Sequence, residues 1–174
     1  MSSLVVGIAD CKTSRDPRES LVTYALGSCV GLGVFDPQAT VGGLLHVLLP
    51  EASLDAAKAA HNPCTFADTG LPVLLERCRV LGAAPARLRV WLAGGSSVLD
   101  QCGVFNIGKR NQLAMRKALW KAGLMIHAED VGGSGSRTVR LDLATGTFWI
   151  RTTGAAEQEL KAHAAGAYGG GQWR

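Results

Sequence analysis

Short apolar runs recur along this chain, and each is bounded by polar residues or by glycine and proline. Runs of this length that are rich in β-branched residues are typical of strands. They cover residues 3–9, 21–26, 29–35, 41–48, 87–93, 124–131, 137–143 and 147–151. The polar segment 11–20, CKTSRDPRES, is predicted to be a loop. The chain is therefore expected to be rich in β-structure.

The clearest helical pattern covers residues 107–122, where apolar side chains form one stripe of an amphipathic helix. Asn106 is expected to cap this helix, and Gly123 to end it. Asn111 lies beside the stripe, so we expect its amide to bond a nearby loop. The stripe consists of Ile107, Ala114, Met115, Ala118, Leu119 and Ala122.

A second long helix is predicted from Asp68, as its N-cap, to Leu81, with Gly82 just beyond its end. A shorter helix is predicted at residues 53–60. Two main helices among many strands, several of them joined by short turns, predict an α/β domain of mostly antiparallel strands.

The length of 174 residues suits one domain with a single core, which we assign to residues 1–153. Residues 154–174 are rich in glycine and alanine and end in YGGGQWR, so a flexible C-terminal tail is expected there. A short helix at 157–164 is the alternative for the first part of this tail.

The composition is that of a folded protein, with 47% hydrophobic and 18% charged residues. No apolar run has the length of a membrane-spanning helix, and the N-terminus lacks the basic region of a signal peptide, so a cytoplasmic location is expected. The net charge of +4 comes without a dense Lys/Arg run, which argues against nucleic-acid binding. No phosphate-binding loop is present, and no cofactor is expected.

The five cysteines include no C-x-x-C pair, so neither a zinc site nor a redox dithiol is predicted. In a reducing compartment we expect free thiols, most of them small buried apolar groups. They are Cys11, Cys29, Cys64, Cys78 and Cys102.

Cys29 and His46 lie in the apolar stretch 21–50, which reads as buried strands. If Phe35 pairs with Thr40 across a four-residue loop, Cys29 lies directly opposite His46 on the same face of a hairpin. A five-residue loop would shift the register by one residue and turn His46 to the other face. The pair is therefore either core packing or a nucleophile beside its base.

A cysteine beside an imidazole can lose its proton to become a nucleophilic thiolate, and a third group usually orients the imidazole. Thr23, Tyr24 and Ser28 are the candidates for that group. The turn at Gly27, Ser28 and the cysteine also offers backbone N–H groups for an oxyanion hole.

Gly31 and Gly33 follow on the same face of the cysteine strand. They leave either a slot for a substrate backbone or room for close packing of another element.

The arrangement T-x5-C within LGSCV, followed by D-P-x4-GG-x2-H-x3-P over residues 36–50, resembles the CheD family of chemoreceptor glutamine deamidases. The resemblance continues through FADTGLPVLLERCRVLGA, the glycine pair of WLAGGSSV, NIGKRN and DVGGSGSR. It implies a single-domain three-layer sandwich in which Cys29 is the nucleophile, His46 the base and Thr23 the third member. Gly27 and Ser28 would line the site.

The resemblance also implies that the substrates are glutamine side chains in the cytoplasmic domains of chemoreceptors, which the reaction converts to glutamate. A CheC-like phosphatase is a further partner implied by the family. Two alternatives stay open from the residues: a related cysteine hydrolase, such as a receptor methylesterase, and a non-catalytic module that regulates a CheC-like phosphatase.

Overall fold

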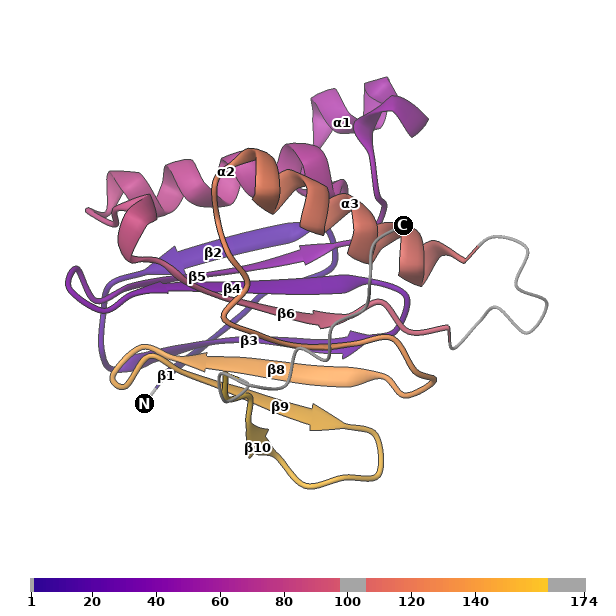
Figure 1. The fold of residues 1–174 in the computed structure, drawn as a ribbon. Coiled ribbons are helices and arrows are strands. Elements are labelled where there is room, and N and C mark those ends of the chain that lie inside the picture. The colour runs from indigo at the N-terminus through magenta and orange to yellow at the C-terminus, as the bar shows by residue number, and fades with distance from the viewer. Residues whose placement is uncertain (1, 98–105, 163–174) are drawn as a thin grey trace, which may run out of the picture.

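A computed structural model describes residues 2–97 and 106–162 of the chain (Figure 1). It has three layers: two long helices, a five-stranded sheet beneath them, and a second five-stranded sheet beneath the first. Neighbouring strands are antiparallel except in the pairs β1 with β3 and β6 with β7. The expected three-layer α/β sandwich with mostly antiparallel strands and two main helices is therefore confirmed.

The sheet next to the helices, called the upper sheet, has the strand order β2-β5-β4-β6-β7. Its strands are β2 (Asp10–Ser14), β5 (Val41–Val47), β4 (Val30–Asp36), β6 (Arg89–Gly94) and β7 (Ala128–Val131). The lower sheet has the order β1-β3-β8-β9-β10. Its strands are β1 (Ser2–Val5), β3 (Glu19–Leu26), β8 (Arg137–Asp142), β9 (Thr147–Thr152) and β10 (Gln158–Glu159).

The helix layer lies over the outer face of the upper sheet (Figure 1). Its two long helices are α2 (Ala67–Val80) and α3 (Ile107–Lys121), and α1 (Ala56–His61) is short. Short 3₁₀ turns occupy Ala52–Leu54, Pro63–Thr65 and Pro85–Arg87. No helix in the described ranges is both long and apolar enough to cross a bilayer.

The central strands β4 and β5 are buried along their whole length because both faces of the upper sheet are covered. Val30, Leu32 and Val34 pack into the core beneath the helices, whereas Phe35 and Leu44 pack into the core between the sheets. Their nearly uninterrupted apolar sequence follows from this double burial.

Gly31 and Gly33 face the lower sheet at a point of very close approach. A Cβ atom at Gly31 would lie 2.7 Å from Cδ1 of Leu26, and one at Gly33 would lie 2.3 Å from the ring of Phe148. Of the two explanations for these glycines, close packing is therefore correct, and the space is filled by side chains of the lower sheet.

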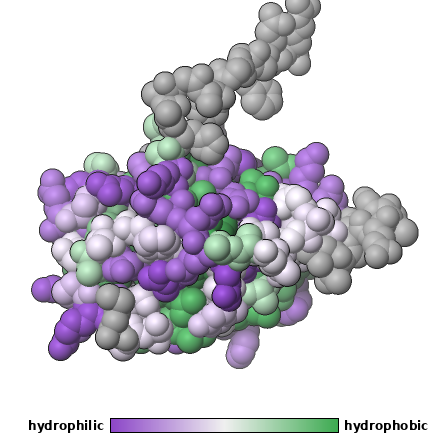
Figure 2. All heavy atoms as spheres, turned by 90° about the horizontal axis from the view of Figure 1, so that it is seen from below, coloured by the Kyte–Doolittle hydropathy of each residue, from purple (hydrophilic) through white to green (hydrophobic). Residues whose placement is uncertain are grey.

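The outer face of the lower sheet carries polar side chains at alternate positions of β8, in keeping with one wet and one buried face. Arg140 lies over the ring of Trp149, with its guanidinium carbon 5.4 Å from the ring centroid, and also bonds Glu157. Figure 2, which views the molecule from below, shows mostly hydrophilic side chains around smaller hydrophobic patches.

Three expectations about individual segments were wrong. Residues 10–14 form the strand β2 rather than a loop, because its backbone supplies the edge partner that β5 needs. Phe66, not Asp68, is the N-cap of α2, and the Asp68 carboxylate instead accepts the N–H of Ala52. Residues 158–159 pair with β9 as a strand, so the alternative of a helix at 157–164 fails in its described part.

The expected cap of α3 is confirmed, since the Asn106 side chain accepts the N–H of Lys109. The division of the chain at residue 153 stays a prediction, because β10 continues the lower sheet beyond it and residues 163–174 lie outside the described part.

Candidate active site

The candidate site lies at the end of β3, where the chain leaves the lower sheet for the upper one. A bulge interrupts the pairing of β3 with β8 between Thr23 and Leu26, and Ala25 within it has a φ of 57°. Bulges bend a strand and redirect its side chains. The chain then passes through the turn at residues 27–29 and enters β4, so Cys29 stands just before the first residue of that strand.

The hairpin of β4 and β5 has a register two residues away from the expected one. Gly31, not Cys29, lies opposite His46. The turn starts one residue later because the Asp36 carboxylate accepts the N–H groups of Gln38 and Ala39 and holds them in the loop. A shift of two residues leaves the face unchanged, so the expected placement of Cys29 and His46 on one side of the sheet stands, whereas direct opposition was wrong.

His46 is 1% exposed and lies between the sheets, where its Nδ1 is 2.7 Å from the Thr23 hydroxyl. The same hydroxyl donates its proton to the Val6 carbonyl at 2.7 Å. A hydroxyl has one proton, and a carbonyl only accepts, so Nδ1 of His46 must carry a hydrogen and donate it to Thr23. The Nε2 atom of the neutral ring therefore has a free lone pair.

Thr23 is the candidate third group that reaches the imidazole. Tyr24 is 51% exposed and points away from the core, and neither Tyr24 nor Ser28 bonds His46 in the part of the chain that the structure describes.

The Nε2 atom of His46 is buried and has no hydrogen-bond partner among the described residues. Burial lowers the pKa of His46 to about 4, so the ring is neutral at physiological pH. Burial raises the pKa of the Cys29 thiol, an effect that its own backbone N–H partly offsets. Both shifts favour the uncharged forms, a neutral thiol and a neutral imidazole.

Cys29 also differs from the other described cysteines in its surroundings. It packs into the core between the sheets, near the end of β3, whereas Cys11, Cys64 and Cys78 belong to the core beneath the helices. All four are free thiols, as expected, and Cys102 lies outside the described residues. The three thiols beneath the helices therefore lie in a different core from the candidate site.

The turn before β4 is held by donors from other segments. The Gly27 carbonyl accepts the N–H of Ser96 at 2.8 Å, and the Cys29 carbonyl accepts the N–H of Gly95 at 2.7 Å. A Cβ atom at Gly94 would lie 2.4 Å from the Cys29 carbonyl oxygen, so the glycine pair permits this approach. The glycine pair was part of the family resemblance, but nothing in the sequence indicated that it supports Cys29.

Asn111 supplies the third support, and its amide donates to the carbonyls of Ser28 at 2.9 Å and Leu48 at 3.0 Å. The expectation that this amide bonds a nearby loop is confirmed. Its place beside the apolar stripe was the signal, but the sequence could not say which loop it reached.

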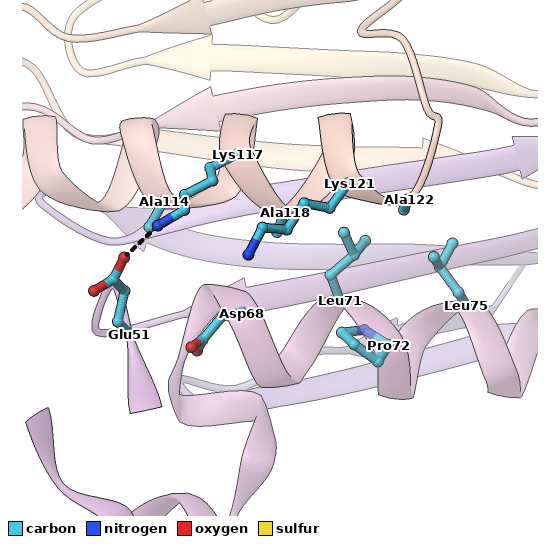
Figure 3. A pocket seen from close by; sticks show the side chains of 10 residues that line it. All are labelled: Glu51, Asp68, Leu71, Pro72, Leu75, Ala114, Lys117, Ala118, Lys121 and Ala122. Carbon is cyan, nitrogen blue, oxygen red and sulfur yellow. Dashed lines mark hydrogen bonds and ion pairs between the residues drawn. The ribbon is translucent and has the colours of Figure 1, made fainter. Parts of the chain in front are cut away.

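A separate groove of about 450 Å³ lies between α2 and α3, with an apolar floor and two lysines along α3 (Figure 3). One of them, Lys117, is 3.5 Å from Glu51. The groove is lined by Glu51, Asp68, Leu71, Pro72, Leu75, Ala114, Lys117, Ala118, Lys121 and Ala122. None of the candidate site residues contributes to it. Among the described residues, no group of three or more His, Cys, Asp or Glu side chains could hold a metal ion.

Comparison with known proteins agrees with the resemblance seen in the motifs. The family model described as "CheD chemotactic sensory transduction" matches residues 48–152. The "Probable chemoreceptor glutamine deamidase CheD" of Solibacter usitatus (strain Ellin6076) is 48% identical over 158 residues, which cover 91% of this chain and 94% of that protein. This chain belongs to the CheD family.

A second CheD relative is the "Probable chemoreceptor glutamine deamidase CheD 1" of Syntrophus aciditrophicus (strain SB). It is 44% identical over 160 residues, which cover 92% of this chain and all of that protein. Among solved structures, the Bacillus licheniformis hypothetical protein YfiH aligns with a TM-score of 0.46 at 15% identity, covering 72% of this chain and 50% of that one. The CheD family match begins after Cys29 and His46, so the roles of these residues rest on their motif and geometry.

Proposed function

We propose that this chain deamidates glutamine side chains of chemoreceptors, with Cys29 as nucleophile, His46 as base and Thr23 as the residue that orients the imidazole. The CheD relatives carry the name of this activity. The observation that carries the proposal is the buried His46 ring, with Nδ1 bonded to Thr23 and a free Nε2, on the same side of the upper sheet as Cys29.

In the first half of the reaction, Nε2 of His46 takes the thiol proton of Cys29 as the sulfur attacks the carboxamide carbon of glutamine. The carbonyl oxygen becomes an oxyanion, which backbone N–H groups of the turn at Gly27, Ser28 and Cys29 stabilise. The imidazolium then gives its proton to the departing nitrogen, and ammonia leaves behind a γ-glutamyl thioester.

In the second half, His46 removes a proton from water, and the resulting hydroxide attacks the thioester carbon. The C–S bond breaks, the sulfur recovers its proton from His46, and the glutamine side chain is released as glutamate. The imidazolium that forms in each half is stabilised through Nδ1–H by the Thr23 hydroxyl, which stays anchored to the Val6 carbonyl.

The test is conversion of glutamine to glutamate in the cytoplasmic domain of a cognate receptor, followed by mass spectrometry of receptor peptides. We expect conversion with the wild type and none with Cys29→Ala or His46→Ala. Cys78→Ala is the matched control, because this cysteine is also buried but lies in the core beneath the helices, and it should retain activity. Conversion that persists in Cys29→Ala would overturn the mechanism.

The same spectra separate the related hydrolases. Deamidation replaces the –NH₂ group of the side-chain carboxamide by –OH and leaves the backbone whole. An esterase instead removes the methyl group of a methylated glutamate. A non-catalytic module would give no conversion at all, and Cys29→Ala would then retain the cellular function of the wild type.

The resemblance also supports binding of a CheC-like phosphatase. It further supports a cytoplasmic location, where the chain would encounter both the receptor domains and the phosphatase. Co-elution of the full chain with a CheC-like protein on size exclusion tests the first of these. Elution of the two proteins at their separate volumes would contradict it.

A further inference from the structure

All three carbonyl groups of the turn that precedes β4 point toward donors in the protein interior. Backbone N–H groups of Ser96 and Gly95 hold the carbonyls of Gly27 and Cys29, and the side chain of Asn111 holds the carbonyl of Ser28. The Ser28 carbonyl is the one of the three that depends on a side chain, so its support can be removed by substitution.

A peptide unit is planar and trans, so its N–H points opposite to its C=O. The Ser28 carbonyl and the Cys29 N–H belong to one such plane, and the Gly27 carbonyl shares a plane with the Ser28 N–H. Fixing the two carbonyls inward therefore fixes the two N–H groups outward. Neither N–H bonds another residue within the described part of the chain.

The Cys29 N–H lies against its own sulfur atom. When that sulfur attacks a carboxamide, the oxyanion forms on the carbon bonded to it, within reach of a donor beside the sulfur. An amide whose carbonyl accepts a hydrogen bond is also polarised into a stronger N–H donor. The bond from Asn111 thus both aims the Cys29 N–H and strengthens it.

The stability of α3 does not explain why an asparagine occupies position 111. It is fully buried on α3, where asparagine has a lower helix propensity than alanine or leucine. Its Oδ1 atom is buried with no hydrogen-bond partner among the described residues, and an unsatisfied buried acceptor destabilises the fold. The amide NH₂, in contrast, is fully used on the two carbonyls.

The second of these bonds goes to Leu48, two residues after His46. One side chain therefore joins the turn that carries the nucleophile to the end of the strand that carries the base. A displacement of either segment would stretch one of the two bonds.

We propose that Asn111 is a positioning residue of the deamidase reaction, which fixes the Ser28–Cys29 peptide so that the Cys29 N–H serves as an oxyanion donor. The inference rests on the proposed function and deepens it. Asn111 does not touch the substrate, and it acts through the peptide unit that it holds.

The experiment compares wild type and Asn111→Ala in two reactions of the same cysteine. Deamidation of the receptor domain forms an oxyanion, whereas alkylation of Cys29 by iodoacetamide forms none. We expect kcat for deamidation to fall roughly 100-fold with KM little changed, as for loss of one oxyanion donor. The rate of Cys29 alkylation, followed by mass spectrometry of its peptide, should stay unchanged.

Asn111→Leu is a second variant in case the alanine variant does not fold, because leucine has the same branched arrangement of four side-chain heavy atoms and favours the helix. Asn62→Ala is the control, since the Asn62 side chain also makes two backbone bonds, to Ala9 and Cys64, and is not a site residue. It should lower the melting temperature without lowering kcat.

An unchanged kcat in a folded Asn111 variant would overturn the proposal. An equal loss of deamidation and alkylation would also overturn it, because the side chain would then act on the thiol and not on the oxyanion. Absence of conversion by the wild type, with normal alkylation of Cys29, would instead count against the proposed function itself.

Discussion

At the scale of single residues, the candidate base owes its state to the Thr23 hydroxyl and to one atom outside the sequence motif, the carbonyl oxygen of Val6. The Val6 carbonyl takes the Thr23 proton, and this leaves the hydroxyl oxygen to accept the Nδ1 proton of His46. A threonine can do this without charge, so in the proposed reaction the ring stays neutral until it takes a proton from Cys29. The proposed reaction therefore starts from uncharged partners in a dry interior, where separated charges would be costly.

Thr23→Val removes the acceptor of the Nδ1 proton while keeping the shape of the side chain. Either ring nitrogen can then carry the hydrogen, and a fraction of the enzyme holds the wrong tautomer. We expect kcat to fall by roughly tenfold to hundredfold, the range seen when the group that orients a metal-binding histidine is removed. Steady-state kinetics with the receptor domain measure this.

Thr65→Val is the matched control, because Thr65 is also buried but lies in the 3₁₀ turn Pro63–Thr65, and among the described residues its hydroxyl does not bond His46. A Thr23→Val enzyme with the kcat of the wild type would show that the hydroxyl does not orient the base.

At the scale of elements, the closeness of the two sheets depends on glycines of β4. Gly33 is buried in the middle of β4, where a valine or leucine would be usual. The ring of Phe148 from β9 occupies the space that a larger side chain at this position would need. The lower sheet can then approach β4 closely enough for Thr23 to bond His46 across the interface.

Gly33→Ala should lower the free energy of unfolding by about 1–3 kcal/mol, because the added methyl group overpacks the interface against Phe148. Urea unfolding followed by circular dichroism measures the change. Gly7→Ala is the control, since no atom lies within 4 Å of the added methyl group there. Equal stability of the two variants would contradict the packing argument.

At the scale of the whole molecule, two buried titratable groups make the fold sensitive to acid. Burial lowers the pKa of His46 to about 4. For Asp36, burial raises the pKa, but the bonds from Arg87 and from the backbone N–H groups of Ala84, Ala39 and Gln38 outweigh it and lower the value to about 2. Both groups have a lower pKa in the folded chain than their ordinary values of 6.5 and 3.8.

Between pH 6.5 and pH 4 the unfolded chain binds a proton at His46 that the folded chain does not, so stability falls as the pH falls. This loss is on the order of 3 kcal/mol, at 1.36 kcal/mol per pH unit. A second loss follows below pH 3.8, where Asp36 is protonated in the unfolded chain first. Urea midpoints measured from pH 7 to pH 3 should show both.

His46→Gln should remove the first of these two losses and leave the second, because a glutamine side chain does not titrate. A variant that still loses the same stability between pH 6.5 and pH 4 would show that His46 is not the group responsible.

The local pattern of apolar, polar and capping residues was enough to predict the core strands, the two long helices and the cap of α3 at Asn106. These features depend on side chains only a few residues apart. It also placed Cys29 and His46 on one side of a sheet, since strand side chains alternate with a period of two. Only the tertiary structure decided the two-residue shift of the hairpin, the strand at residues 10–14 and the filling of Gly31 and Gly33 by the lower sheet. The last two outcomes depend on contacts between segments far apart in the chain, as does the series of bonds from Val6 through Thr23 to His46. The shift of the hairpin comes from the bonds that the Asp36 carboxylate accepts within its own turn, which the apolar pattern does not reveal.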